Sequence, residues 1–258
     1  MEDPDQIVCS CCEPSDDDHV NTSSDLTFAK QTKHSSNSLE RAHAESVINS
    51  FHQYATFARF ARDGQTRRVL ALHPAQKRFL PPSLLPGTPE YKERELMIQH
   101  AEIQNQFFFD IMLRHGGIPT SQDVRAEALN EGSECKWSND EHMSKVSSVF
   151  KSLARDWSLE GASERDESYG PILNGFNHYL PIKKGAPHNI VVPGAGLGRL
   201  ALELSSKGYA VEGNEFSLQM LFASDFLLNG GITPQKPLLI SPWLLENRNV
   251  CSISDKCR

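Results

Sequence analysis

Apolar residues recur at helical spacing between residues 39 and 180, and the pattern changes to short strand-like runs after residue 187. One helix is predicted to begin near Leu39, a second to span 89–115 and a third to span about 140–160. The apolar faces that we expect to pack together consist of Val47, Ile48, Phe51, Tyr54, Ala55 and Ala58, then Met97, Ala101, Gln104, Phe108 and Ile111, then Met143, Val146, Phe150, Leu153 and Trp157. The pattern therefore predicts a helical N-terminal region over residues 39–180.

Three stretches outside these helices lack the periodicity. Residues 1–38 are rich in Asp, Ser, Thr and Asn and carry little apolar surface, so we expect a disordered acidic and polar tail. Residues 71–89 contain several prolines and predict a connector. Residues 116–139 are polar, and we expect a loop there.

The strand-like pattern begins with the run His-Asn-Ile-Val-Val-Pro at residues 188–193. Three alternating glycines follow this run, at Gly194, Gly196 and Gly198. The residues after them, 199–207, have apolar positions at helical spacing and predict a helix. An apolar strand that breaks into glycines and then a helix is typical of the opening of a nucleotide-cofactor fold.

A second strand is predicted directly after this helix. Gly208 stands at the position where a helix commonly ends, and residues 209–213 read as the strand. Asn214 and Glu215 follow at its carboxyl end, and another helix is expected over residues 217–229. The order strand, helix, strand, helix predicts the start of a Rossmann-like cofactor-binding domain over residues 188–258.

The glycine spacing indicates which cofactor this turn would hold. Glycine lets a ligand approach the backbone, because no Cβ intervenes, and it tolerates a positive φ. Dinucleotide dehydrogenases carry G-x-G-x-x-G, but Arg199 stands where the last glycine would be. The form G-x-G-x-G is associated with S-adenosylmethionine-dependent methyltransferases, so we predict that Gly194 and Gly196 bind S-adenosylmethionine. A tight turn of an ordinary α/β protein and an NAD or FAD oxidoreductase are the alternatives.

An acidic residue is expected at the tip of the second strand, where it would accept hydrogen bonds from the ribose hydroxyls about 20 residues beyond the glycines. Glu215 lies at that separation from the glycines. Glu212 competes for this role, but the alternation of side chains along a strand points it to a face of the sheet. We therefore predict that Glu215 binds the cofactor.

Length and charge narrow the class of partner. A chain of 258 residues is long enough to bury a core. Its net charge of −7, without a dense patch of Lys and Arg, argues against a nucleic-acid partner. We therefore expect a small or peptidic substrate.

The cysteines and the apolar runs indicate the cellular compartment in which the protein is expected. No apolar run approaches the roughly 20 residues of a membrane span, and the first residues are acidic, so we expect neither a span nor a signal peptide. The six cysteines are scattered in a way that does not fit a disulfide framework, which indicates a reducing compartment, cytoplasmic or nuclear. The run Cys9-Ser-Cys11-Cys12 lacks a second pair of ligands at zinc spacing, so no metal site is predicted.

Three segments resemble the carnosine N-methyltransferase family. VVPGAGLGRLALEL and GYAVEGNEFSLQMLFASDFLLN carry the proline before the glycines and the N-E-[WF]-S motif of that family. Upstream, the residues Leu153-Ala-Arg155-Asp156-Trp157-Ser and Glu164-Arg165-Asp166 resemble its R-D-W-S and E-R-D segment. The resemblance covers about residues 40–229 and is strong over 150–229.

This resemblance implies a class I methyltransferase domain that binds S-adenosylmethionine through the glycine loop, the acid after the second strand and an arginine of the upstream helix. The matching residues are Gly194, Glu215 and Arg155, while Ser152 replaces the family's glutamine three residues before the arginine. A guanidinium can bind the carboxylate of the methionine portion in a bidentate manner. Read from the residues alone, Arg155 has the alternative of a solvated pair with an acidic neighbour, Asp156 or Glu160.

The resemblance also implies a reaction: transfer of a methyl group to the imidazole δ nitrogen of carnosine, giving anserine, or to a related histidine-containing peptide. Homodimers are implied as well. Residues 230–258 do not resemble a continuation of the family, so we expect an α/β fold that is incomplete at its C-terminus and a chain that is unstable or inactive alone. Catalytic residues are not assigned. An inactive isoform acting as a helical interaction module is the alternative function.

Overall fold

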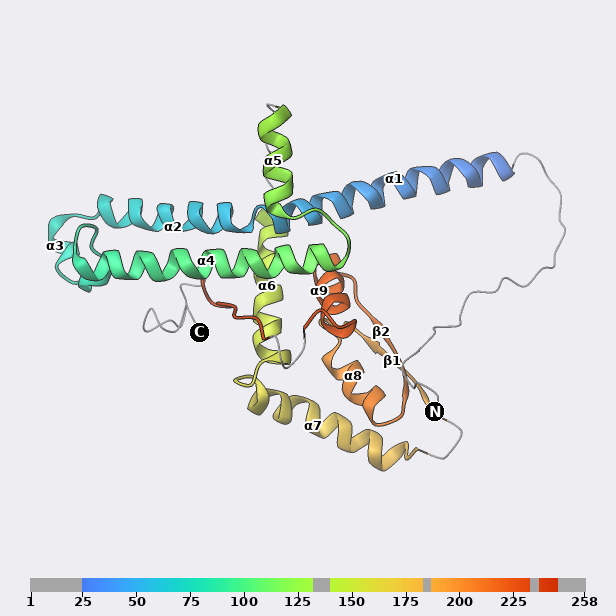
Figure 1. The fold of residues 1–258 in the computed structure, drawn as a ribbon. Coiled ribbons are helices and arrows are strands. Elements are labelled where there is room, and N and C mark those ends of the chain that lie inside the picture. The colour runs from blue at the N-terminus through green and yellow to red at the C-terminus, as the bar shows by residue number, and fades with distance from the viewer. Residues whose placement is uncertain (1–24, 132–139, 183–186, 233–236, 246–258) are drawn as a thin grey trace, which may run out of the picture. The chain divides into compact units, whose positions relative to one another are not determined.

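The computed structural model describes residues 25–131, 140–182, 187–232 and 237–245 (Figure 1). The chain divides into two units, residues 1–42 and 43–258, and both the core and the candidate site belong to the second unit. The helices are α1 (Asp25–His52), α2 (Tyr54–Ala71), α3 (Pro74–Lys77), η1 (Pro82–Leu84, a 3-10 helix), α4 (Pro89–His115), α5 (Ser121–Glu131), α6 (Asp140–Trp157), α7 (Ala162–Tyr179), α8 (Arg199–Ser206) and α9 (Leu218–Leu228). The strands are β1 (Asn189–Pro193) and β2 (Ala210–Asn214).

The main core is built from the helices of the N-terminal region together with α9. Helix α2 packs against α4 and α6, and α9 packs against the same two helices. The buried cluster consists of Val47, Phe51, Tyr54, Ala58, Phe108, Phe109, Met112, Leu113, Met143, Val146, Val149, Phe150, Leu153, Leu197, Ala223, Phe226 and Leu227. The apolar stripes predicted for α1, α2 and α6 contribute Val47, Phe51, Tyr54, Ala58, Met143, Val146, Phe150 and Leu153 to this cluster, which confirms a helical core.

The predicted stripe of α4 is displaced by one residue. Ala101 and Phe108 are buried as predicted, but Ile98 and Met112 are buried in place of Met97 and Ile111, and Met97 is 39% exposed. Two polar residues, Asn105 and Gln106, are buried on this face, whereas the predicted stripe places Gln104 there. The buried polar side chains are accommodated because each is hydrogen-bonded.

The two strands form a parallel pair (Figure 1). In this pair, Ile190 lies opposite Val211 and Pro193 lies opposite Asn214. Parallel strands require a crossover, and α8 provides it. Ile190 is buried with Leu204 of α8 and Tyr209, and two residues of α7, Leu173 and Phe176, pack against them. The β1–α8–β2–α9 unit appears with the predicted boundaries to within a residue or two.

Several boundaries differ from the prediction. Helix α1 begins at Asp25 instead of near Leu39, so residues 25–38 are helical where the sequence predicts a disordered tail. Extending a helix that has already formed costs little per residue, and the apolar residues farther along α1 provide the formed part. The predicted connector 71–89 contains two short helices, α3 and η1, and the helix predicted over 140–160 ends at Trp157.

The loop predicted over 116–139 contains helix α5. Thr120 donates from both its backbone N and its Oγ1 to Asp123 Oδ2, at 2.8 and 2.6 Å. Asp123 N donates back to Thr120 Oγ1 at 3.4 Å, which completes a reciprocal cap. Helix α5 starts here because these side chains satisfy the N–H groups of Thr120 and Asp123 at its N-terminus.

The described residues are therefore mostly helical, with one small parallel sheet. A helical N-terminal region is confirmed, and the described residues show a β–α–β–α unit that matches the beginning of a Rossmann-like domain. All six cysteines, including Cys9, Cys11 and Cys12, lie outside the described residues. Within the part of the chain that the structure describes, none of the helices combines the length and apolar character needed to cross a bilayer.

Candidate cofactor site

The turn between β1 and α8 has three glycines in the left-handed region of φ. The φ angles of Gly194, Gly196 and Gly198 are 65°, 56° and 77°, a region that residues with a Cβ rarely adopt. A Cβ added to Gly194 or Gly196 would meet no atom within 4 Å, so the backbone there faces open space. A Cβ on Gly198 would lie 2.8 Å from Leu228 Cδ1, so this third glycine allows α8 and α9 to approach each other.

Two anchors fix the glycine loop. Leu197 is completely buried in the main helical core. Ala195 N donates to Asn214 O at 2.9 Å, which joins the loop to the end of β2. Gly213 permits this approach, because a Cβ there would lie 3.1 Å from Ala195 Cβ. The open backbone at Gly194 and Gly196 is thus held between two fixed points.

The carboxylate of Glu215 lies against this loop. Gly196 N donates to Glu215 Oε2 at 2.8 Å. Phe216 N and Ser217 N both donate to Glu215 Oε1, also at 2.8 Å. An ionised carboxylate offers about four lone-pair positions, and these three bonds leave one position open on Oε2.

Glu212 occupies a different position from Glu215. Its side chain is exposed, and Oε1 accepts a hydrogen bond from Asn214 Nδ2 at 2.8 Å. The alternation of side chains along a strand predicts that Glu212 points to a face of the sheet and away from the strand tip. Of the two acids considered from the sequence, Glu215 is the one bonded to the glycine loop.

A cavity of about 280 Å³ lies beside the loop. It is lined by Ala195, Gly196, Gly198, Ala201, Leu202, Ser205, Val211, Gly213, Glu215, Leu221, Ser224 and Leu228. The polar side chains of this lining are Glu215, Ser205 and Ser224, and most of the apolar side chains come from α8, β2 and α9. This volume is near the lower end of the range found for small-molecule sites.

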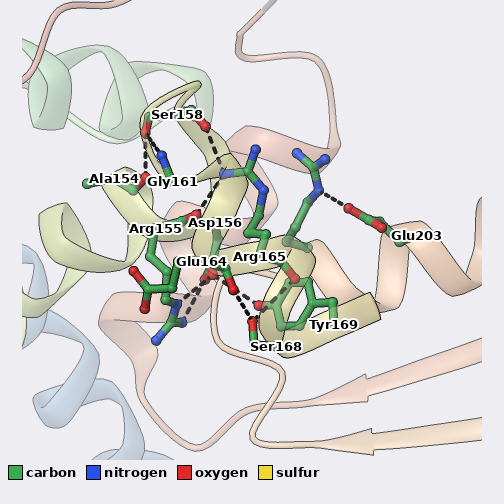
Figure 2. A network of polar contacts seen from close by, with 11 residues as sticks. Ala154, Arg155, Asp156, Ser158, Gly161, Glu164, Arg165, Ser168, Tyr169 and Glu203 are labelled. Atoms are coloured by element: carbon green, nitrogen blue, oxygen red, sulfur yellow. Dashed lines mark hydrogen bonds and ion pairs between the residues drawn. The ribbon is translucent and has the colours of Figure 1, made fainter. Parts of the chain in front are cut away.

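Arg155, the third predicted site residue, is paired with its neighbour Asp156 (Figure 2). Arg155 Nε and Nη2 donate to Asp156 Oδ1 and Oδ2 at 2.7 and 2.9 Å, a bidentate geometry. The Asp156 side chain is 3% exposed and the Arg155 side chain 47% exposed. The structure thus shows the acidic-neighbour pairing that the sequence left as the alternative. Among the contacts of the described residues, none joins Arg155 to the glycine loop.

Asp156 has a second partner that the sequence reading missed. Tyr169 Oη donates to Asp156 Oδ1 at 3.0 Å, so α7 is bonded to the end of α6 (Figure 2). The hydrogen bonds that Arg155 donates to Asp156 raise the pKa of the Arg155 guanidinium. Burial, followed by the charge and the hydrogen bond of Asp156, raises the pKa of Tyr169 to about 12.

Other residues of the same motif have structural roles. Arg165 Nη1 donates to Arg155 O and Ser158 O, at 2.7 Å each, and so satisfies free carbonyls near the end of α6 (Figure 2). The guanidinium of Arg199 lies 5.5 Å from the ring centroid of Trp157, which connects the motif to the first residue of α8.

Comparison with known proteins gives one consistent family. Residues 133–258 match the model described as "Carnosine N-methyltransferase". This match includes residues 230–258 and so corrects the prediction that they do not continue the family. The carnosine N-methyltransferase of Mus musculus is 33% identical over 234 residues, which cover 89% of this chain and 55% of the mouse protein. The chain is a homologue of the carnosine N-methyltransferases.

The other relatives agree. The carnosine N-methyltransferase of Rattus norvegicus is 34% identical over 224 residues, 85% of this chain and 53% of the rat protein. In Drosophila melanogaster, "Carnosine N-methyltransferase unmet" is 48% identical over 107 residues, 41% of this chain and 23% of the fly protein. The chain therefore spans about half the length of the mouse and rat carnosine N-methyltransferases.

Within this carnosine N-methyltransferase homologue, the structure brings Gly194, Gly196 and Glu215 together and leaves Arg155 bonded to Asp156. Sequence reasoning missed Asp156 and Tyr169 as a pair, and it also missed Gln219, a buried amide of α9. A polar residue among the apolar positions of α9 was the available signal for Gln219.

Proposed function

We propose that this chain provides the S-adenosylmethionine site of a methyltransferase that acts on the imidazole δ nitrogen of carnosine, with anserine as the product, or on a related histidine-containing peptide. The observation that carries the proposal is the hydrogen bond from Gly196 N to the Glu215 carboxylate, beside glycine backbone that faces open space. Homology to carnosine N-methyltransferases supports the choice of reaction and acceptor.

The donors and acceptors of this site fit a ribose diol. The open lone-pair position on Glu215 Oε2 can accept from one ribose hydroxyl, and the Gly196 N–H can exchange its partner for a ligand oxygen. The space beside Gly194 and Gly196, which a Cβ would fill, allows a ligand to lie against the backbone. The cavity also offers apolar wall for the rest of a nucleoside.

The same geometry disfavours a dinucleotide. Pyrophosphate binds to backbone N–H groups at a helix N-terminus. Here the Gly196 N–H already faces a carboxylate, so a phosphate at that position would meet a second negative charge at short range. S-adenosylmethionine carries no phosphate and avoids this repulsion.

Arg155 is proposed to bind the carboxylate of the methionine portion. Its bonds to Asp156 use Nε and Nη2, so we assign the contact to Nη1. The side chain is 47% exposed, which leaves it accessible to a ligand. The pair with Asp156 fixes the plane of the guanidinium and reduces the entropy lost on binding.

When bound, S-adenosylmethionine supplies the methyl group on its sulfonium. An imidazole with an ordinary pKa of about 6.5 is mostly neutral at pH 7, so the acceptor nitrogen has its lone pair available. The chain's own residues then have the task of holding and orienting the donor. Catalytic residues are not assigned, and a homodimer in the cytoplasm or nucleus remains a prediction.

The test is calorimetric titration of the full 258-residue chain with S-adenosylhomocysteine, with NADH as the competing ligand class. Glu215→Ala is expected to weaken binding roughly 10- to 100-fold, because a hydrogen bond to a charged group is lost. Glu212→Ala, which removes an exposed acid three residues away, serves as the matched control and should bind like wild type. Arg155→Ala should also weaken binding.

A methyl-transfer assay with carnosine follows once binding is established. Tight binding of NADH, or equal affinity of Glu215→Ala and Glu212→Ala, would contradict the proposed site. A folded wild-type chain that binds neither ligand would instead favour the helical interaction module.

A further inference from the structure

A line of side-chain hydrogen bonds runs from Glu215 to helix α6. Ser217, whose backbone N donates to Glu215 Oε1, donates from its Oγ to Gln219 Oε1 at 3.0 Å. Gln219 Nε2 lies 3.1 Å from His142 Nδ1. Gln219 is only 1% exposed, so its amide has little access to water. These hydrogen bonds connect the segment that carries Glu215 to His142.

The hydrogen-bond donors and acceptors of Ser217 and Gln219 determine the protonation state of His142. The carbonyl oxygen of Gln219 is occupied by Ser217, and its NH₂ group can only donate. His142 Nδ1 must then accept, which requires a neutral ring with its proton on Nε2. A protonated His142 would place an N–H at Nδ1 opposite the Gln219 NH₂, and two donors cannot bond each other.

The groups around His142 influence the pH at which its ring becomes protonated. His43 of α1 lies beside it, with ring centroids 5.6 Å apart, and Glu141 and Lys145 flank it on α6, bonded to each other at 2.8 Å. From α9 it faces the uncharged Gln219. Burial, then the positive charges of His43 and Lys145, lower the pKa of His142, and Glu141 opposes them. These surroundings favour the neutral ring that the geometry requires.

We propose that His142 is a positioning residue for the cofactor site: its neutral Nδ1 holds Gln219 and, through Ser217, sets the Glu215 carboxylate to receive the ribose of S-adenosylmethionine, so that protonation of His142 weakens cofactor binding. This inference rests on the proposed function. It adds a dependence of cofactor affinity on pH, and it connects the N-terminal helical region to the glycine loop.

The size of the effect follows from the fraction of neutral His142. If only the neutral form is competent, the apparent dissociation constant is the intrinsic one divided by that fraction. Because the pKa of His142 lies below the ordinary value of 6.5, lowering the pH from 7.5 to 5.5 weakens binding by no more than about tenfold.

The experiment measures S-adenosylhomocysteine affinity of the full chain at pH 7.5 and pH 5.5, with circular dichroism at both pH values to confirm folding. His142→Ala removes the acceptor and should bind weakly at both pH values. His142→Asn places an amide oxygen near the position of Nδ1 and does not titrate. It should restore the affinity that His142→Ala loses and give the same affinity at both pH values. His100→Asn, which changes an exposed histidine of α4, is the matched control and should keep the wild-type pH dependence.

A second variant tests the direction of the hydrogen bond. Gln219→Glu replaces the donor with an acceptor, so its partner becomes the protonated form of His142. Its affinity relative to wild type should rise as the pH falls. This reversal distinguishes positioning from a purely structural role, which would lower stability without reversing the pH profile.

The outcomes separate this inference from the proposed function. If wild type binds S-adenosylhomocysteine at pH 7.5 but His142→Asn keeps the wild-type pH dependence, the role of His142 is wrong while the cofactor site stands. If the affinity of Gln219→Glu relative to wild type does not rise as the pH falls, the role of His142 is likewise wrong while the cofactor site stands. If folded wild type fails to bind at pH 7.5, both proposals are overturned.

Discussion

Asn105 and Ser241 exchange two hydrogen bonds across 136 residues of sequence. Asn105 Nδ2 donates to Ser241 O at 2.9 Å, and Ser241 N donates to Asn105 Oδ1 at 2.8 Å. The side-chain amide on α4 thus pairs with the backbone as a neighbouring strand would. Asn105 Nδ2 also donates to the hydroxyl of Tyr54, 2.8 Å away, so one buried amide makes three hydrogen bonds with two residues.

Asn105→Ala is expected to lower the free energy of unfolding by about 2–4 kcal/mol, because it leaves buried polar groups of Tyr54 and Ser241 without partners. Urea denaturation measures the change. The matched control is Gln99→Ala, an exposed position on the same helix, which should change stability by no more than about 0.5 kcal/mol. Equal effects of the two variants would contradict the role of this amide.

The glycine loop allows stability and binding to be separated. Gly196→Ala should cost about 1–2 kcal/mol, since alanine is strained at a φ of 56° but meets no neighbour. S-adenosylhomocysteine binding should be lost, because the new Cβ fills the space assigned to the ligand. Gly198→Ala, with the same strain plus a contact with Leu228, should be the less stable variant. Thermal unfolding measures the stability of both variants, and calorimetry measures ligand binding. Normal binding of S-adenosylhomocysteine by Gly196→Ala would contradict the placement of the ligand against Gly196.

The raised pKa of Tyr169 predicts how the free energy of unfolding changes at alkaline pH. Its pKa in the folded chain is about 12, above the ordinary value of 10.0, so the protonated phenol is favoured by folding. The resulting stabilisation is fully present below pH 10 and is lost as the pH rises toward 12. The difference in unfolding free energy between wild type and Tyr169→Phe should therefore shrink over that interval. Tyr179→Phe, at a tyrosine that is 79% exposed, is the control.

The ion pairs of Arg62 hold α2 to α4. Its guanidinium bonds Glu102 at 3.0 Å and also Glu95, and the side chains of Arg62 and Glu102 are 10% and 5% exposed. Arg62→Ala leaves a buried carboxylate unpaired and should cost about 3–5 kcal/mol. Arg68→Ala, at an exposed position of α2, should be nearly neutral. Chemical denaturation of both variants tests this, and a loss below about 1 kcal/mol for Arg62→Ala would be inconsistent with it.

The β–α–β unit could be predicted closely because its signals are local. Three glycines, a helix stop at Gly208 and the alternation that separates Glu212 from Glu215 all lie within a short stretch of sequence. The same reasoning missed α5, although Thr120 and Asp123 are a recognisable capping pair. The polar residues around this cap favour a loop, and for that reason the segment is predicted as a loop and not as a helix.

Features that depend on distant partners could not be predicted. The buried face of α4 was displaced by one residue because Asn105 finds its partners far along the chain. The hydrogen bond between His142 and Gln219 spans 77 residues, and no periodicity indicates it. For Arg155, the sequence offered both a ligand and a neighbouring acid, and only the geometry shows the bond to Asp156.

The burial of Leu197 has a consequence for how binding can be detected. This residue lies within the glycine loop, yet it belongs to the same buried cluster as Phe108 and Phe150 of the helical core. Opening the loop would expose Leu197, at a cost of about 1.5–3 kcal/mol, so the loop and the core are expected to melt together. A ligand that binds only the closed loop then stabilises the whole cluster by mass action, and the melting temperature of helices distant from the ligand becomes a measure of its affinity.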